Sequence, residues 1–246
     1  ILTLTLDRPE RLNAVTDAML DELAEAVERA SANPDVRVVV LAGKGRAFCS
    51  GADISGGQDV EKASTSTIDA GERLVRAITT SPLPVVARAR GVVAGIGVPV
   101  ALAADLTLSD EDSYFLLAFT RIGLMPDGGA SALVAASVGR AKALRMALLA
   151  EKVSARDAFV MGLIGGVYPA DEYDDEVAKI LDQLAHGPAV AYARTKHSVN
   201  EATLGALDQT FVTELKGQTG LLLADDFAEG QKAFGEKRTP QFSDRP

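Results

Sequence analysis

The chain has 246 residues, 47% of them hydrophobic, and its formal net charge is −9 at pH 7. This length and composition predict one large domain with a substantial core, and the acidic balance argues against nucleic acid or an anionic membrane surface as a partner. Cys49 is the only cysteine and there are two histidines, so neither an intrachain disulfide nor a typical His/Cys metal site is expected. No apolar run reaches membrane-spanning length, and the default prediction is a cytoplasmic enzyme.

Strand and helix signals alternate along the first half of the chain. Alternate leucines predict a strand over Ile1–Leu6, and Thr16 is expected to cap a helix over Asp17–Ala30. The β-branched run Val36–Leu41 predicts a strand that is buried on both faces. The remaining predictions for this half are a glycine-rich loop over Gly43–Gly57, a helix over Ile68–Ile78, a strand over Val85–Ala89, a helix over Val98–Ala104 and mixed strand and turn over Thr107–Leu117.

The second half of the chain is predicted to be mainly helical. Helices are predicted over Gly139–Ala150, Asp171–His186, Pro188–Leu204 and Gly205–Phe234, and Ser154 with Asp157 forms an acidic variant of a capping box. Strand–helix alternation followed by helices predicts an α/β layered core with a helical C-terminal extension. The expected division is a core over residues 1–186 and a helical oligomerisation region over residues 187–246.

Two glycine-punctuated turns carry the strongest chemical signal. They are Gly45–Asp53, with the sequence GRAFCSGAD, and Arg90–Gly97, with the sequence RGVVAGIG, and each follows a strand-like run. Small residues in such turns let backbone N–H groups point into a cleft, and two N–H groups from separate loops can hold one developing oxyanion. A purely structural role as tight turns explains Gly95 and Gly97, but it does not explain why both motifs occur together.

Five ordered segments resemble the crotonase (enoyl-CoA hydratase/isomerase) superfamily. They are Leu4–Ala14, Gly45–Ile54, Arg90–Asp105, Ala118–Gly129 and Asp226–Phe242. The segment Ala118–Gly129 is most similar to the phenylacetate-pathway branch of ring-epoxide and enoyl-CoA isomerases. The resemblance implies ββα units that form a spiral of two stacked sheets, C-terminal helices that form a homotrimer or a hexamer, and an acyl-CoA substrate.

The resemblance also implies a set of binding residues. The N–H groups of Ala52 and Ile96 would form an oxyanion hole for the thioester carbonyl, although the family usually has glycine at the Ile96 position. Residues implied in binding coenzyme A are Arg11, Leu12, Arg46, Ala52, Asp53, Ile54, Gly95, Phe234 and Lys237, the last two often acting in a neighbouring subunit, and Lys44 and Arg238 could add positive charge. Coenzyme A enters here as part of the substrate, and no separate cofactor or metal is implied.

The acid–base residues decide which reaction is expected. Family hydratases use two glutamates to add water across a double bond, and this chain has Pro99 and Phe119 at those places. The remaining candidate is Asp127, because one carboxylate is sufficient for a 1,3-proton shift. An apolar lining from Phe119, Ile122 and Met125 would raise its pKa. The alternative is that Asp127 is only a turn residue, since Asp-Gly is common in turns.

The sequence thus favours an enoyl-CoA isomerase and leaves three alternatives open. They are a non-catalytic acyl-CoA binder, a hydratase that recruits other groups, and a hydrolase or dehalogenase in which Asp127 attacks the substrate. The segment with Gly56, Gly57 and Ser64–Thr67 is interpreted either as a lid over the acyl chain or as a plain surface loop. Residues not expected to carry catalysis are the acids Glu61, Glu72, Asp110 and Asp112, the packing residue Cys49, and the histidines His186 and His197.

Overall fold

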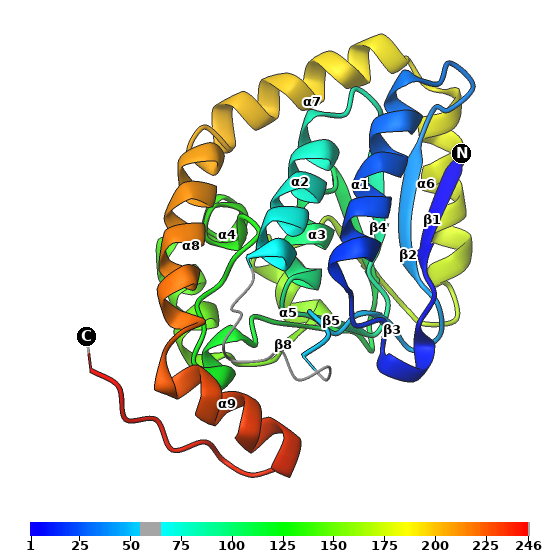
Figure 1. Ribbon diagram of the computed structural model, residues 1–246. Helices are drawn as coiled ribbons and strands as arrows, with labels where there is room; N and C mark the ends of the chain where they lie inside the picture. The colour runs from blue at the N-terminus through cyan, green and yellow to red at the C-terminus, as the bar shows by residue number, and fades with distance from the viewer. Residues whose placement is uncertain (55–64, 246) are drawn as a thin grey trace.

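The computed structural model describes residues 1–54 and 65–245 (Figure 1). Gly56, Gly57 and Ser64 of the expected lid lie outside these residues, as does Glu61. At the far end of that segment, Ser66 and Thr67 begin a helix, and both hydroxyls donate hydrogen bonds to Asp17.

Two sheets form the centre of the molecule. The first is fully parallel and consists, in spatial order, of β1 (Leu2–Leu6), β2 (Val39–Gly43), β4 (Val85–Arg88), β6 (Leu106–Asp110) and β9 (Gly166–Tyr168). The second consists of β3 (Ala47–Cys49), β5 (Val92–Ala94), β7 (Tyr114–Leu116) and β8 (Val153–Ser154), of which β8 alone is antiparallel to its neighbour. Each consecutive pair β2–β3, β4–β5 and β6–β7 therefore gives one strand to each sheet.

Helices follow the first strand pairs and cover the sheets. They are α1 (Asp17–Ala32), α2 (Ser66–Thr80) and α3 (Gly97–Ala103), and α1 lies beside α2 (Figure 1). The Thr16 side chain accepts a hydrogen bond from Met19 N at 3.4 Å, which confirms the predicted cap. The repeated strand–strand–helix order confirms the ββα arrangement that the resemblance implies.

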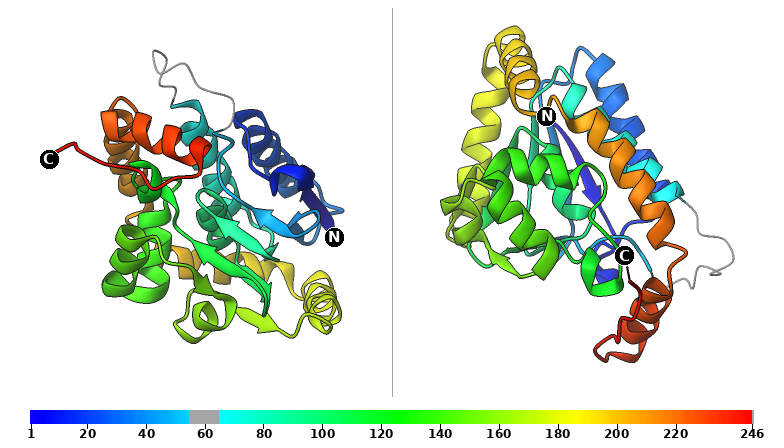
Figure 2. Two further views of the ribbon diagram at one scale, coloured as in Figure 1. Left: turned by 90° about the horizontal axis from the view of Figure 1, so that it is seen from below. Right: turned by 90° about the vertical axis from the view of Figure 1, so that its left-hand side faces the viewer.

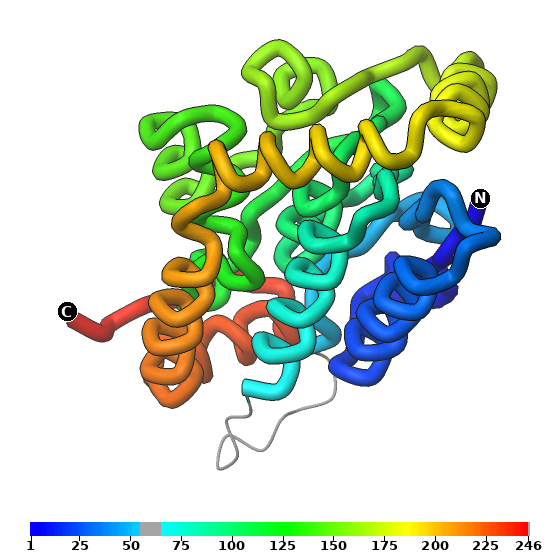
Figure 3. The backbone as a smooth tube through the Cα atoms, turned by 90° about the horizontal axis from the view of Figure 1, so that it is seen from above, coloured from blue at the N-terminus to red at the C-terminus, as the bar shows by residue number. Residues whose placement is uncertain are grey.

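The second half wraps helices around this core. They are α4 (Ala130–Leu149), α5 (Ala155–Val160), α6 (Tyr173–His186), α7 (Ala189–Thr203), α8 (Leu207–Leu221) and α9 (Asp225–Glu236), with short 3-10 helices η1 (Pro9–Arg11) and η3 (Phe119–Ile122). Seen from above, α7 spans the molecule from α6 to α8 (Figure 3). No helix in the described part of the chain is long and apolar enough to cross a membrane.

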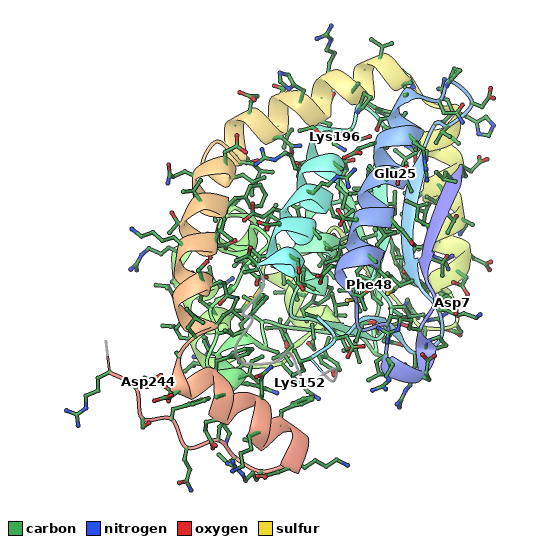
Figure 4. All side chains as sticks on the ribbon, in the orientation of Figure 1. Asp7, Glu25, Phe48, Lys152, Lys196 and Asp244 are labelled. Carbon is green, nitrogen blue, oxygen red and sulfur yellow. The ribbon has the colours of Figure 1, made fainter. Side chains whose placement is uncertain are left out.

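One buried cation ties α7 to the core. Lys196 of α7 points inward (Figure 4) and its Nζ donates to Ile78 O at 2.8 Å and Leu83 O at 3.2 Å. The same ammonium group pairs with Asp105 at 2.9 Å. Phe48 of β3 also lies inside the molecule (Figure 4) and belongs to the main hydrophobic core.

Several predicted elements differ from the observed ones. The strand predicted over Val36–Leu41 is β2, which begins three residues later and ends at Gly43. Helix α4 begins at Ala130 and continues past a kink at Gly139, where φ is +76°, so the predicted start at Gly139 is wrong. The short strands β3 and β5 lie inside the glycine motifs, where three residues are too few to show a two-residue period. The predicted helix over Gly205–Phe234 is two helices, α8 and α9, separated at residues 222–224.

The second glycine motif depends on a close backbone contact at Gly91. A Cβ on Gly91 would lie 2.1 Å from Arg46 O, and Gly91 has a φ of +72°. We expect Gly91→Ala to destabilise the fold by more than ~2 kcal/mol, because the left-handed conformation costs about 1–2 kcal/mol in a non-glycine residue and the backbone clash adds to it. Urea unfolding measures the change.

Gly162→Ala is the matched control. Gly162 follows α5 with a φ of +84°, but the atom nearest to a Cβ there, Ser137 O, would lie at an ordinary contact distance of 3.5 Å. It therefore carries the conformational cost without the clash, and equal destabilisation of the two variants would contradict the importance of the contact between Gly91 and Arg46.

Candidate active site

The two glycine turns meet at one edge of the second sheet. Strands β3 and β5 run parallel, so the turns that follow them leave the sheet at the same edge. A Cβ on Gly51 would lie 3.6 Å from Ala94 O, and a Cβ on Gly95 would lie 3.1 Å from Gly51 Cα. Both glycines have a positive φ, +113° and +53°. The backbones therefore pack directly against each other, which places Ala52 and Ile96 at adjacent turns.

The N–H groups of Ala52 and Ile96 have no acceptor in the part of the chain that the structure describes. A bridge between Val15 and Ala52 uses the bonds Val15 N to Gly51 O and Asp53 N to Val15 O, both 2.9 Å. In a parallel bridge of this kind the N–H of Ala52 points to the opposite side. Within residues 1–54 and 65–245, neither N–H donates a hydrogen bond. Two such donors are the arrangement that stabilises an oxyanion.

The Ile96 side chain brings the remaining parts of the site together. Its Cδ1 lies 3.0 Å from the position that a Cβ would take on Gly71 of α2, and 2.3 Å from that position on Gly128. Pro99 Cγ lies 3.4 Å from the same point on Gly128. Because Asp127 directly precedes Gly128, its carboxyl-bearing loop lies against the Ile96 turn and the first turn of α3.

Asp127 is a buried acid with a perturbed pKa. Asp127 is 8% exposed, and Nε2 of Gln218 donates a hydrogen bond to Oδ2 of Asp127 at 2.8 Å. Burial raises the pKa of Asp127 to about 7; the negative charges of Glu214 and Glu72 add to the rise, and the hydrogen bond from Gln218 opposes it. A carboxyl group with a pKa near neutrality can both accept and return a proton. The pKa of Asp127 is therefore raised, as predicted, and the negative charges of Glu214 and Glu72 contribute to a rise that the sequence attributed to an apolar lining alone.

Helix α8 supplies two buried polar side chains to this loop. Glu214 and Gln218 are four residues apart, so they lie on one face of the helix. Glu214 accepts from Gly129 N at 2.7 Å and Ser131 N at 2.9 Å, which satisfies N–H groups at the start of α4. Gln218 Oε1 accepts from Met125 N at 3.2 Å. The only sequence signal for either residue is a polar side chain on the inward face of a helix.

Glu72 is a second carboxyl group in this neighbourhood. It follows Gly71 on α2, and its Oε1 atom is buried without a hydrogen-bond partner among the described residues. Burial is the main cause of its raised pKa, with further contributions from Asp69 and Glu214. By contrast, Asp110 is paired with Arg90 at 2.9 Å and Asp112 is exposed, so neither belongs to the site.

The residues implied in coenzyme A binding form one group at the N-terminal side of the site. Ser50 N donates to Leu12 O at 3.0 Å, and Ser50 Oγ donates to Arg11 O at 3.3 Å. A Cβ on Gly45 would lie 3.1 Å from Pro9 Cβ, which brings the turn before Arg46 beside the same segment. The structure therefore brings Arg11, Leu12, Arg46, Ala52 and Asp53 to one region, and Ile54 ends the described part of that segment.

Phe234 and Lys237 lie elsewhere in the chain. Helix α9 packs against η3 (Figure 2): a Cβ on Gly230 would lie 2.6 Å from the backbone of Ile122. Phe234 is 64% exposed, and Lys237 ends α9 with a φ of +54°. Among the described residues, hydrogen bonds of Glu229 join α9 to Arg238 and Gln241 of the tail that follows it.

Several other sequence candidates have ordinary structural roles. Lys44 pairs with Asp7 at 2.8 Å, and Arg238 pairs with Glu229 and Glu236. Burial raises the pKa of Cys49 to about 12, so it stays a packed thiol. His186 and His197 are exposed on α6 and α7. The described residues contain no group of three or more His, Cys, Asp or Glu side chains able to hold a metal ion.

Comparisons with known proteins agree with this geometry. A family model described as enoyl-CoA hydratase/isomerase matches residues 1–245. The chain is 40% identical to a probable enoyl-CoA hydratase of Rhodobacter capsulatus, over all of this chain and 95% of that protein. It is 34% identical to 1,2-epoxyphenylacetyl-CoA isomerase of Escherichia coli K12, over 99% of this chain and 95% of that protein. The crystal structure of an enoyl-CoA hydratase from Mycobacterium avium subsp. paratuberculosis K-10 matches with a TM-score of 0.93 and 49% identity, over 98% and 94% of the two chains.

The buried carboxyl of Asp127 is expected to cost stability at neutral pH. Because its pKa is about 7 in the folded state and 3.8 ordinarily, folding disfavours the ionised form, and stability falls as the pH rises between these values. We expect Asp127→Asn to be more stable than wild type by roughly 2–4 kcal/mol above pH 7 and similar to it near pH 3. Urea unfolding across this pH range measures the difference. The exposed Asp112→Asn is the control, and parallel pH curves for wild type and Asp127→Asn would contradict the expectation.

Removal of the Glu72 charge is expected to ease ionisation of Asp127. Glu72→Gln keeps the shape of the side chain and removes one of the negative charges that raise the Asp127 pKa, so this pKa should fall. Carbon-13 NMR of aspartate-labelled protein measures it, with the Asp127 signal assigned by its absence from Asp127→Asn. Glu22→Gln, at an exposed carboxyl on α1, should leave the titration unchanged. A rise in the Asp127 pKa of Glu72→Gln would show that Glu72 acts in some other way.

Proposed function

The chain belongs to the enoyl-CoA hydratase/isomerase family, and from this premise we propose that it isomerises enoyl-CoA thioesters by a 1,3-proton transfer at Asp127. The observation that carries the proposal is one buried carboxyl group beside two available backbone N–H groups. Asp127 precedes Gly128, which lies against the side chain of Ile96, and Ile96 supplies one of the two N–H groups. Base and oxyanion donors therefore lie on adjoining segments.

The chemistry follows from these two elements. The N–H groups of Ala52 and Ile96 hold the thioester oxygen of a 3-enoyl-CoA, where negative charge develops. The Asp127 carboxylate removes a proton from C2, and the electrons of that C–H bond form a dienolate. The protonated Asp127 then returns the proton to C4, so that the double bond moves from C3–C4 to C2–C3 and the carboxylate is restored. A pKa near 7 suits a group that must take and return one proton.

The coenzyme A part of the substrate is proposed to lie along the N-terminal group. Arg11 and Arg46 supply positive charge, and the segment of Leu12 and residues 52–54 supplies backbone contacts, with Gly95 behind the thioester. Phe234 and Lys237 of a neighbouring copy complete this site in a homotrimer or hexamer. In that arrangement their exposure in one chain, 64% for Phe234, is relieved by the neighbour.

Hydration is the second candidate function. Relatives named enoyl-CoA hydratase favour it, and Glu72, whose buried Oε1 has no hydrogen-bond partner among the described residues, offers a second carboxyl group to hold a water molecule. Against hydration, the places of the two hydratase glutamates carry Pro99 and Phe119, neither of which has a titratable proton. Phe119 is buried in the hydrophobic core, and Pro99 lies in the first turn of α3. Isomerisation needs one carboxyl group and is therefore favoured.

The decisive variant is Asp127→Asn. We expect it to lower isomerase turnover at least ~1,000-fold, because no other group replaces the proton carrier, while CoA-ester binding stays within about threefold. Purified protein with a 3-enoyl-CoA in heavy water reports turnover through conjugated thioester absorbance and deuterium incorporation. Hydration of a 2-enoyl-CoA is measured beside it.

Asp112→Asn, at an exposed aspartate, is the matched control and should retain full activity. Retained isomerase turnover in Asp127→Asn would remove Asp127 from the mechanism. Hydration by the wild-type protein, without isomerisation, would replace the proposal with the second candidate. Binding of both esters without turnover of either would identify a non-catalytic acyl-CoA binder.

A further inference from the structure

We propose that Gln218 is a positioning residue for Asp127: its side-chain amide holds Oδ2 of the carboxyl group and leaves Oδ1 as the oxygen that accepts and returns the proton. The proposal rests on the function proposed above for Asp127. Gln218 belongs to α8, far from Asp127 in sequence, and it is 1% exposed.

The orientation of the Gln218 amide is fixed by two bonds of opposite polarity. Its Oε1 accepts from Met125 N at 3.2 Å, and its Nε2 donates to Asp127 Oδ2 at 2.8 Å. A flipped amide would place its NH₂ group against the Met125 N–H and its oxygen against a carboxylate, and both contacts would be repulsive. The group facing Asp127 is therefore a donor.

A donor at Oδ2 determines what each carboxyl oxygen can do. An amide N–H gives no acceptor to a carboxylic acid proton, so the proton of the neutral acid is carried on Oδ1. The same bond stabilises the ionised form, which opposes burial and the negative charges of Glu72 and Glu214. Without it, Asp127 would be a weaker acid and its carboxyl group would be free to rotate.

The two bonds also fix the carboxyl group relative to the backbone. Met125 and Asp127 lie on either side of Pro126, so one side chain spans this short segment. One helical turn earlier, Glu214 binds the N–H groups of Gly129 and Ser131 on the other side of Asp127. Because Glu214 is an independent anchor, a change at Gln218 alone removes the bond to Asp127 without detaching α8 from the loop.

The test compares Gln218→Met, Gln218→Glu and Gln209→Met. Gln218→Met keeps much of the side-chain volume and removes both bonds. Gln218→Glu keeps the acceptor for Met125 N–H but replaces the amide donor with an acidic group. Gln209→Met makes the same substitution at an exposed position of α8 and is the control. Thermal unfolding establishes whether each variant is folded. If Gln218→Met does not fold, Gln218→Glu is used for the test.

We expect both Gln218 variants to lower isomerase kcat by about 10- to 100-fold, as the loss of a hydrogen bond to a charged group does, with KM for the CoA ester changed less than about threefold. The acidic limb of the kcat/KM profile should move to higher pH, and carbon-13 NMR should show a higher Asp127 pKa. The Asp127 pKa is thus expected to rise in the Gln218 variants and to fall in Glu72→Gln. Gln209→Met should match wild type throughout.

An unchanged Asp127 titration and an unchanged kcat in the Gln218 variants would overturn the positioning role. A fall in kcat with no movement of the acidic limb or of the NMR titration would also overturn it, since a merely structural role has that result. The NMR titration does not depend on turnover, so it tests the role of Gln218 separately from the proposed function. Retained isomerase activity in Asp127→Asn would overturn the proposed function and would leave the titration test of Gln218 valid.

Discussion

The direct backbone contact between Gly51 and Gly95 is the constraint on which the rest of the site depends. A side chain at Gly95 would press on the facing turn, because its Cβ would lie 3.1 Å from Gly51 Cα, whereas a Cβ on Gly51 would make an ordinary contact with Ala94 O at 3.6 Å. The contact fixes the turn of Ala52 against the turn of Ile96. The Ile96 side chain then reaches Gly71 and Gly128, so α2 and the Asp127 loop are placed by the same contact. The close approach at Gly95 thus places the turns of the proposed oxyanion donors and the Asp127 loop against one another.

Burial of the Asp127 carboxyl group has opposite consequences for stability and for its proposed role in proton transfer. Burial raises its pKa to about 7, which makes it suitable for proton transfer but makes the ionised form costly to bury. The fold limits that cost through Gln218, and it limits flexibility through Glu214, which satisfies the first N–H groups of α4. Without the hydrogen bond from Gln218, the carboxyl group would gain freedom to rotate and would ionise still less readily.

Local pattern was sufficient for the parts of the fold and site that are encoded within short segments. The glycine turns around Ala52 and Ile96, the cap at Thr16 and the buried strand β2 all show in consecutive residues. Glu214 and Gln218 could not be identified in this way, because their partners lie about 90 positions away, as for Gln218 and Asp127 at a separation of 91. Helix α4 was predicted too short although its buried residues Ala130, Leu133 and Val134 have the i, i+3, i+4 spacing of a helix, because Gly139 interrupts the helix with a non-helical backbone conformation.

Pro99 links the loss of one acid to the activation of another. By resemblance, its place is that of a hydratase glutamate, and its ring contributes no proton. Its Cγ lies 3.4 Å from the position of a Cβ on Gly128, so an apolar ring stands beside the Asp127 loop where a hydratase would carry a charged side chain. A carboxylate there would draw water into the site and would add a negative charge near Asp127. Pro99 places an apolar ring there instead, and burial is the main cause of the raised Asp127 pKa. In the proposed isomerisation, the absence of an acid that hydration needs and the apolar surroundings of Asp127 would thus follow from the same residue.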